Sequence, residues 1–536
     1  MFVAVALVLA LTARMSAQAP PKSTFFSTAA EESYSTYELP GDGDLWPSCW
    51  ATDGNLYAAN GDGMAFDPYE KPLDFNKRYD MAVSRIEGVP PHLSGTTIAR
   101  DIGTDWSGPK YNRKPTGMLC IGGAIYLAFQ NLAKSNFNDA PAASIAKSVD
   151  DGKTWTWDAS APMFGDPENP SSAKAHKFTT IFFLDFGRDS RNSIDKYVYA
   201  YGLDNNWRAQ QALYLARVPN DRIQTRSAWE FYAGVDDRGD PRWAQDITGK
   251  KAVLEDERLP YADGSGKRCP VNQHVIGQGG VVYDKPLQRY IFTSWSCATH
   301  QMYEAPEPWG PWKLFLSKDF GPFFTAHNYG EYGTNIPSKF ISQDGKALYL
   351  QSNLWVRAYT FSLRKVYLEP FKPGVPSNGP SPNDLALMPG TRALSKSTHF
   401  GSLCGLNCSD ALSGSGASSE DDFDGEPKTT DWWGYEWPAP YKFNEVVYET
   451  GSLSPEGGWF AGTPRVQIYR DFRWMDVGEV SVSPPYPGSM AAGDHLRYTF
   501  KFPFTWGYGV RIIGVPGGGN HYTSISRLGV YYSAEN

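Results

Sequence analysis

The sequence has little charge of either sign and no basic excess. Asp, Glu, Lys and Arg make up 20% of the 536 residues, and 58 acidic residues outnumber 50 basic ones. The net charge of -8 gives no electrostatic footprint for nucleic acid or an anionic membrane, whose binding needs clustered Lys and Arg. Beyond the N-terminus, no apolar run is long enough to cross a bilayer. We therefore expect no nucleic-acid partner and no membrane span, and we predict a monomer.

Cofactor motifs are missing as well. The sequence contains no dinucleotide fingerprint, no P-loop and no H-E-x-x-H pair, so we expect no cofactor and no catalytic metal. Asp-rich loops offer oxygen ligands for a structural calcium, but no position for one is assigned. The six cysteines are an even number, which permits disulfides in an exported chain in any of 15 pairings. They are Cys49, Cys120, Cys269, Cys297, Cys404 and Cys408.

The first residues, MFVAVALVLALTARMSAQAPP, have the pattern of a signal peptide. The apolar stretch is too short to span a bilayer, and Ala17-Gln18-Ala19 supplies small residues for cleavage. We predict that residues 1–19 are removed and that the mature protein is secreted or periplasmic.

The chain contains 52 Gly and 40 Pro residues, and 15% of its residues are aromatic. This composition is typical of a loop-rich all-β protein. Five segments repeat a short strand with a central aromatic residue, about 60 to 90 residues apart, which is the length of a four-stranded propeller blade with inserted loops. They are NLYAANGD, AIYLAFQN, YVYAYGLD, RYIFTSWS and ALYLQSNL. We predict a five-bladed β-propeller over residues 20–370, whose central channel holds the ligand site.

A second repeat marker is SVDDGKTW, which has the Asp-box pattern S-x-D-x-G-x-T-W. Its Asp150 and Gly152 favour a tight hairpin turn, and its Trp packs between blades. We therefore expect Asp150 to be a structural residue and not a catalytic one.

The composition changes after residue 370, where KPGVPSNGPSPND has the Pro, Gly and Ser content of a linker. We place this linker at residues 371–390 and a second domain at 391–536. DWWGYEWP and the ending TWGYGVRIIGVPGGGNHYTSISRLGVYY resemble the galactose-binding-like, discoidin-type fold. The resemblance implies a jelly-roll β-sandwich that either binds glycan or braces the first domain.

The candidate catalytic residues lie in GDGDLWPSCWATDGNLYAANGDG, residues 41–63. Asp53-Gly54 is a strong hairpin signal. If residues 52–54 form a three-residue loop with Gly54 left-handed, paired residue numbers sum to 106, and Asp44 faces Asp62 on one side of the hairpin. A two-residue turn would send the two side chains to opposite faces. Asp42 and Asp53 have simpler explanations as turn residues.

Several phrases in the first domain resemble the family catalogued as domain of unknown function 4185, some of whose members are endo-D-arabinanases of glycoside hydrolase family 183. The resemblance rests on GDGDLWPSCW with NGDG, KPTGML, DKYVYAYG, QGGVVYDKPLQRYIFTSW, YEAPEPWGPWKLF and IPSKFISQDGKALYL. It implies a five-bladed propeller with a catalytic aspartate pair, which matches Asp44 and Asp62. The first motif is more aromatic than the family's usual form, and this departure puts D-arabinan itself in doubt as the substrate.

Two opposed carboxylates suit glycosidic bond cleavage, with one acid for the leaving oxygen and one nucleophile or base. We assign Asp62 as the acid and Asp44 as the nucleophile or base, on an arabinan-type polysaccharide. Spacing between the carboxyls would decide retention or inversion. Residues at strand ends suited to substrate contact are Trp46, Lys114, Asp204, Trp207, Trp295 and Lys339.

Two other functions fit the same pattern. A polysaccharide lyase acting on a uronic-acid polymer would recruit His327, Tyr332 and Lys339 as base and cation. A non-catalytic, lectin-like propeller would bind glycan without Asp44 and Asp62. Ultraviolet-absorbing products would favour the lyase, and the absence of new reducing ends would favour the lectin.

Overall fold

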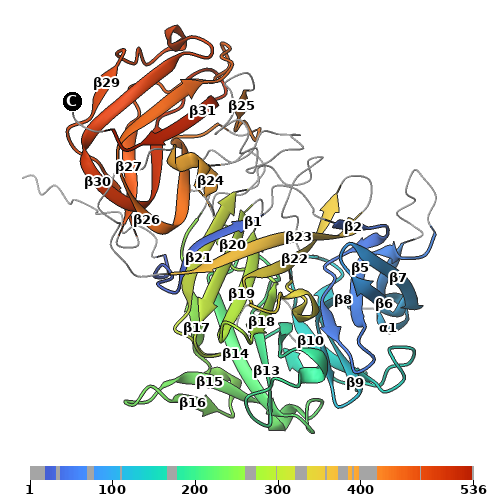
Figure 1. Ribbon diagram of the computed structural model, residues 1–536. Coiled ribbons are helices and arrows are strands. Elements are labelled where there is room, and N and C mark those ends of the chain that lie inside the picture. Colours follow the sequence, from blue (N-terminus) through green and yellow to red (C-terminus); the bar gives the residue numbers. More distant parts are fainter. Residues whose placement is uncertain are drawn as a thin grey trace, which may run out of the picture.

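The computed structural model describes most of the chain, with gaps. The described ranges are 19–31, 37–68, 78–108, 111–165, 178–259, 273–296, 299–319, 335–355, 359–371, 384–388, 391–396, 419–425, 427–470 and 473–533. Nearly all regular structure is β, which confirms the predicted all-β class (Figure 1).

The first two sheets follow the chain in order. One contains β3 (Asp42–Asp44), β4 (Ser48–Trp50), β5 (Leu56–Ala65), β6 (Tyr79–Val89) and β7 (His92–Ala99). The next contains β8 (Tyr111–Ile121), β9 (Ala124–Ala133), β10 (Ala142–Ser148) and β11 (Phe164–Gly165). Both are antiparallel, with neighbours in sequence paired in space. Such local pairing is what short strands joined by tight turns produce.

A larger sheet joins two further antiparallel groups. The first group is β12 (Thr180–Asp185), β13 (Tyr197–Leu203), β14 (Ala212–Pro219), β15 (Glu230–Val235), β16 (Pro241–Ala244) and β17 (Ala252–Glu255). The second is β18 (Gly280–Asp284), β19 (Arg289–Ser296), β20 (Thr299–Ala305) and β21 (Lys313–Asp319). The only parallel strand contact in this sheet, among the residues described, joins β12 to β18 through Leu184 and Val281.

The next sheet combines both ends of the first 371 residues. It contains β1 (Phe26–Glu31), β2 (Tyr37–Leu39), β22 (Ala347–Trp355) and β23 (Tyr359–Pro370). β1 and β2 both pair with β23, so the first strands of the chain lie beside strands more than 300 residues later (Figure 1).

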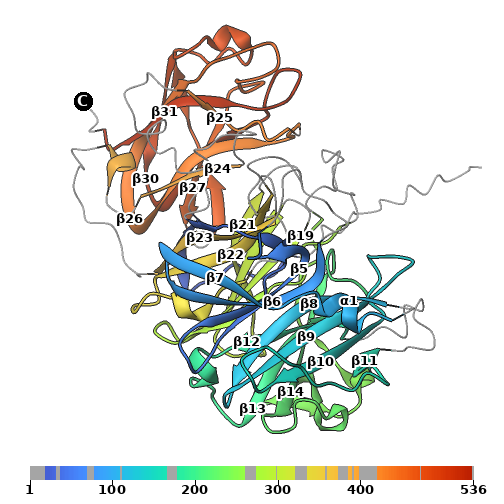
Figure 2. The ribbon, with the colours of Figure 1, turned by 90° about the vertical axis from the view of Figure 1, so that its right-hand side faces the viewer.

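The C-terminal part forms a separate antiparallel sheet, drawn in orange and red in Figures 1 and 2. Two long strands, β26 (Asp431–Thr450) and β30 (Arg497–Gly514), pair along most of their length. They enclose a core rich in aromatic side chains, including Trp437, Tyr448 and Phe460. The remaining strands are β24 (Arg392–Ser395), β25 (Glu420–Asp421), β27 (Arg465–Arg470), β28 (Arg473–Asp476), β29 (Ser481–Ser483) and β31 (Ser524–Tyr531).

In the part of the chain that the structure describes, helices are few and short. The α-helix is α1 (Ile102–Trp106), and the 3₁₀ turns are Arg188–Ser190, Arg226–Ala228, Ile247–Gly249, Ser338–Phe340, Leu385–Leu387 and Met490–Ala492. Across the ranges given above, no helix is long and apolar enough to cross a membrane.

All five repeat segments are strands: β5, β9, β13, β19 and β22. Each of the first four is the second strand of its group, flanked by a preceding and a following strand. β22 has the same place, since Gln351 bridges to Asn335 on one side and the strand pairs with β23 on the other. The aromatic pattern therefore marks strands with neighbours on both sides, whose side chains pack between sheets.

Two local predictions can be compared with the structure. In the Asp box, both carboxylate oxygens of Asp150 accept hydrogen bonds from Thr154, and the Trp155 indole donates to the Gly152 carbonyl, which confirms a structural turn. Of the open cysteine pairings, the structure forms Cys49–Cys120, between β4 and β8. The other four cysteines lie outside the described residues.

Candidate functional site

The hairpin that carries the candidate acids has the predicted turn. Ala51 and Asn55 are hydrogen-bonded across a three-residue loop, and Gly54 has a φ of 88°. Ser48 pairs with Ala58, Cys49 with Tyr57 and Trp50 with Leu56, so the numbers of each pair sum to 106. A local Asp-Gly signal was enough to predict this register, because the turn type alone determines it.

The register does not continue to the acids. Leu45 and Trp46 have positive φ values of 70° and 50°, which break the ladder between β4 and β3. Beyond this interruption Asp44 pairs with Gly61, so the predicted direct pairing of Asp44 with Asp62 is wrong by one residue. Asp62 itself has a φ of 41°. Left-handed backbone at non-glycine residues is uncommon and gathers at functional sites.

Gly61 gives the Asp44 carboxyl its space. A Cβ at position 61 would lie 2.5 Å from Asp44 Oδ1 and 3.4 Å from Lys114 Cδ. The Asp44 carboxyl therefore lies directly against the β5 backbone, beside the side chain of Lys114. Its own side chain is buried, with the residue 4% exposed.

Lys114 of β8 connects the first two sheets at this point. Its Nζ contacts Asp62 Oδ1 at 2.5 Å and Asp80 Oδ1 at 3.1 Å, and donates to the Asp80 carbonyl at 3.0 Å. The Lys114 side chain is 5% exposed, whereas Asp62 and Asp80 are 48% and 32% exposed. One covered ammonium thus holds two accessible carboxylates side by side.

The carboxylates around Lys114 shift its pKa. Burial alone would lower the pKa of Lys114, but the carboxylates of Asp62, Asp80 and Asp44 outweigh burial and raise it. Three carboxylates against one ammonium leave the cluster with a surplus of negative charge when all are ionised. A site of this kind can present one carboxyl as an acid and another as a charged group.

The sequence did not indicate Asp80. It lies near the start of β6, opposite Asp62, because Gly61 pairs with Met81 and Gly63 with Tyr79. Its backbone N–H donates to Asp101 Oδ1 at 2.9 Å, which fixes the strand end. The signal that could have found Asp80 is the β5–β6 register, but the connection between Ala65 and Tyr79 contains no turn motif that determines it.

Asp42 and Asp53 both have structural roles, but only Asp53 is the turn residue that the sequence predicted. Asp53 is a turn residue, and it accepts hydrogen bonds from the Asn55 backbone and side chain. Asp42 is not in a turn; it is a β3 residue in a buried ion pair with Arg78 at 2.8 Å. Burial raises the pKa of Asp42, and Arg78 opposes this shift.

Two of the predicted aromatic residues lie next to the site. Trp295 is buried and packs with Leu45, the neighbour of Asp44, together with Tyr359. The Trp207 ring lies 5.5 Å from Trp295 and is partly exposed. Asp204, close by in sequence, is held by Lys250 Nζ at 2.7 Å and by the Phe178 backbone N–H.

Trp46 and Lys339 are placed elsewhere. Trp46 is 0% exposed and packs against Phe66 and Phe361 in the core. Lys339 lies in the turn Ser338–Phe340, in the electrostatic range of Asp53 and Arg188, at the closed end of the hairpin. Asp44 and Asp62 are at the open end of the same hairpin, so the structure does not bring Lys339 to them.

Some residues of the alternative functions cannot be placed. His327 and Tyr332, the residues of the lyase hypothesis, lie outside the described residues. Within the part of the chain that is described, no group of three or more His, Cys, Asp or Glu side chains is placed to hold a metal ion.

Comparison with solved structures gives remote similarity only. An exo-β-1,3-galactanase from Phanerochaete chrysosporium is 10% identical with a TM-score of 0.35, over 94% of this chain and 100% of the other. A hydrolase described as putative from Bacteroides ovatus is 12% identical with a TM-score of 0.34, over 61% and 86%. A carbohydrate-binding module from Clostridium perfringens is 18% identical with a TM-score of 0.21, over 26% and 95%.

A search among curated proteins gives no match. Residues 71–365 match the family described as a domain of unknown function, DUF4185, and this range is more than half of the chain. It includes Asp80, Lys114, Trp207 and Trp295, and begins after Asp44 and Asp62. The chain therefore belongs to the DUF4185 family.

Proposed function

We propose that the protein is a secreted glycoside hydrolase that cleaves internal bonds of an arabinan-type polysaccharide, most closely a D-arabinofuranan. The observation that carries the proposal is the cluster of Asp44, Asp62 and Asp80 around Lys114. Ordinary ion pairs need no strained backbone, yet the hairpin has left-handed residues at Leu45, Trp46 and Asp62. Strain of this kind costs stability and is typical of functional sites.

The contacts favour one division of roles between the acids. Asp62 is accessible and contacts the Lys114 ammonium, which suits an ionised carboxylate acting as nucleophile or base. Asp44 is covered, and burial favours the neutral, proton-donating form of a carboxyl. This order is the reverse of the one that we expected from the sequence. Asp80 keeps Lys114 in place and is a positioning residue.

The reaction then follows the two-carboxyl scheme. Asp44 donates its proton to the glycosidic oxygen as the bond to the anomeric carbon breaks. Asp62 either bonds to the anomeric carbon, to be displaced by water, or accepts a proton from the attacking water. The partly exposed Trp207, beside Trp295 and Leu45, offers an apolar surface for a sugar ring next to the acids.

The sheet order supports a propeller as the architecture. Groups of four or more strands follow the chain from β3 to β23, and β1 and β2 add to the last group, as the closure of a propeller requires. We propose five blades over residues 20–370, a linker at 371–390 and a β-sandwich at 391–536. The Cys49–Cys120 disulfide fits an oxidising compartment, which supports export.

A polysaccharide panel tests the proposed activity. The protein is incubated with mycobacterial arabinogalactan, plant arabinan and a uronic-acid polymer, and the products are separated by size. We expect new reducing ends and intermediate-length fragments from the arabinan-type polymers. Products with ultraviolet absorbance would support a lyase instead, and binding without any new reducing end would support a non-catalytic propeller.

A further inference from the structure

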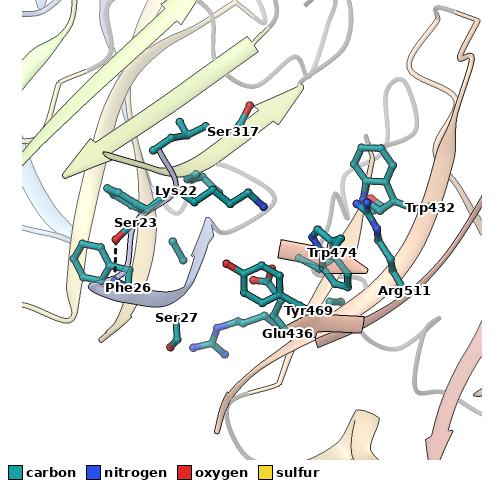
Figure 3. Close-up of a pocket in the computed structure, with 18 of the residues that line it drawn as sticks. Lys22, Ser23, Phe26, Ser27, Ser317, Trp432, Glu436, Tyr469, Trp474 and Arg511 are labelled. Carbon is teal, nitrogen blue, oxygen red and sulfur yellow. Dashed lines mark hydrogen bonds between the residues drawn. The ribbon is translucent and has the colours of Figure 1, made fainter. Parts of the chain in front are cut away.

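A cavity lies where the C-terminal sheet meets the first domain, away from the acid cluster. Its volume is about 460 Å³, within the range of small-molecule sites. Figure 3 shows Lys22 and Ser317 on one side and Trp432, Glu436, Tyr469, Trp474 and Arg511 on the other. The proposed hydrolysis does not use any of these residues.

The aromatic side chains belong to the outer face of the C-terminal sheet. Trp433 and Tyr435 point into the core of this sheet, so the alternating Trp432 and Glu436 point outward. Tyr469 and Trp474 are a cross-strand pair of β27 and β28 on the same face. These aromatic side chains are partly exposed, and partly exposed aromatic side chains gathered on one sheet face are characteristic of binding surfaces.

Two glycines leave room on this face. A Cβ at Gly509 would lie 3.1 Å from Glu436 Cγ and 3.2 Å from Trp474 Cη2. Across the ladder, Gly434 pairs with Arg511. The missing side chains let the larger groups lie flat along the sheet and keep the cavity open.

The charge of the lining is strongly one-sided. Four cationic residues line the cavity, Lys22, Arg392, Lys396 and Arg511, against a single acid, Glu436. This surplus stands out in a chain whose net charge is -8. Glu436 makes no ion pair within 4 Å with any described residue, although Lys22 and Arg511 both act on it electrostatically.

The Arg511 guanidinium is held in place by two aromatic rings and one hydrogen bond. It lies 4.9 Å from the Trp432 ring and 4.5 Å from the Trp474 ring, and its Nε donates to Gln467 Oε1 at 2.8 Å. None of the described residues accepts a hydrogen bond from its two Nη atoms. Burial lowers the pKa of Arg511 to about 10, the sign of a cation that has lost water without gaining enough negative charge.

Lys22 completes the site from the first domain. Its backbone is fixed beside Leu314, with hydrogen bonds from Ser23 N to Leu314 O and from Leu314 N to Pro21 O, both 2.8 Å. Its Nζ lies 5.2 Å from the Tyr469 ring. The cavity therefore needs both parts of the chain in place.

We infer that this cavity binds a saccharide unit that carries a carboxylate, such as a hexuronic acid. The carboxylate meets Arg511 and Lys22, and the C–H face of the sugar ring packs on Tyr469 and Trp474. This site is independent of the proposed catalytic one, and it would tether the protein to acidic glycan near its substrate.

The test is calorimetric titration of the full chain with a galacturonic-acid trisaccharide, a neutral galactose trisaccharide and inorganic phosphate. We expect saturable binding of the acidic trisaccharide and none of the neutral one. Lys22→Gln and Arg511→Gln should each weaken binding about tenfold or more. The backbone hydrogen bonds beside Lys22 do not involve its side chain, so Lys22→Gln leaves them in place. Arg497→Gln, an exposed arginine paired with Glu449 outside the cavity, is the matched control and should bind as the wild type does.

Each remaining result contradicts the inference. If the neutral and acidic trisaccharides bind equally well, the carboxylate does not contribute to binding. If phosphate binds as tightly as the acidic trisaccharide, the sugar ring does not contribute. If Lys22→Gln binds as the wild type does, or if Arg497→Gln weakens binding equally, the ligand binds at another surface. Because Asp44→Asn leaves this cavity intact, failure of the catalytic proposal would not affect these titrations.

Discussion

Lys114 is the residue on which the candidate site depends most. It is almost fully covered, it comes from a different sheet than the acids, and it contacts both Asp62 and Asp80. Burying an ammonium is costly unless carboxylates compensate, so the site keeps its charge balance only while these contacts persist.

Replacing this ammonium should destabilise the fold in a pH-dependent way. Lys114→Met is expected to lower the free energy of unfolding by about 2 kcal/mol at pH 8, because the facing carboxylates lose their counter-charge. The loss is limited to this size because Asp62 and Asp80 are partly exposed to water. The pKa of Lys114 is raised in the fold, so its contribution is complete below about pH 10.4 and is lost as the pH rises through the folded-state value. Denaturant unfolding at pH 8 and pH 11 measures both effects.

The control for this prediction is Lys285→Met. Lys285 is an exposed lysine that contacts Asn192. A stability difference between wild type and Lys114→Met that stays constant up to pH 11, or one no larger than that of the control, would contradict the prediction.

The roles of residues whose partners are close in sequence could be predicted, and the roles of residues whose partners are distant in sequence could not. Asp53 and Gly54 make their turn with their immediate neighbours, and Asp150 makes its own with Thr154. Asp80 depends on a lysine 34 residues away in another sheet. No pattern within a segment carries that information.

At the scale of single elements, the hairpin of β3, β4 and β5 determines where the acids lie. Its closed end follows the turn, whereas its open end is displaced by the left-handed residues Leu45 and Trp46. The sequence indicated the turn, but the L-W and W-P steps at residues 45–47 do not specify positive φ. The fully buried Trp46, expected at the substrate, holds this displaced segment on the core.

A substitution in β5 tests the position of the Asp44 carboxyl. In Gly61→Ala the new Cβ would come within 2.5 Å of Asp44 Oδ1, so the carboxyl must move. We expect kcat to fall about tenfold or more, since displacing a catalytic group by about 1 Å can cost that much. Gly108→Ala, which meets nothing within 4 Å, should keep the wild-type rate. Equal rates for both variants would mean that Asp44 need not lie there.

The Asp-box turn separates structural from catalytic acids. Hydrogen bonds from Thr154 lower the pKa of Asp150 to about 2, so its stabilising effect is present above about pH 4 and is lost as the pH falls towards 2. Asp150→Asn should lower Tm by a few degrees, roughly 2–4 °C, at pH 7 and leave kcat unchanged. Calorimetry with an activity assay checks both, and a large loss of kcat would contradict the structural role.

At the scale of the whole molecule, the Cys49–Cys120 disulfide joins β4 to β8 and so the acids to Lys114. The sequence allowed this cysteine pairing among many others. It did not single the pairing out, because the spacing of the cysteines does not specify which strands become neighbours. The all-β class could be predicted from composition and repeats, whereas the return of β1 and β2 to β23 could not.

Removing the disulfide should weaken the whole first domain. The two cysteines are 71 residues apart, which corresponds to a loop-closure contribution of about 4 kcal/mol. We expect Cys49→Ser with Cys120→Ser to lower the free energy of unfolding by about this amount, measured by denaturant titration. Reductant should then have a much smaller effect on the double variant than on the wild type; an equal effect would show that the stabilising bond lies elsewhere.

The proposed catalytic site is tested by the rate at which three aspartate variants release reducing ends from the arabinan-type polysaccharide. We expect Asp44→Asn and Asp62→Asn each to lose about 10²–10⁴-fold in kcat with Tm within a few degrees of wild type. Asp53→Asn, in the turn of the same hairpin, should keep its rate within a few-fold. Full activity in either Asp44→Asn or Asp62→Asn would contradict the proposed site.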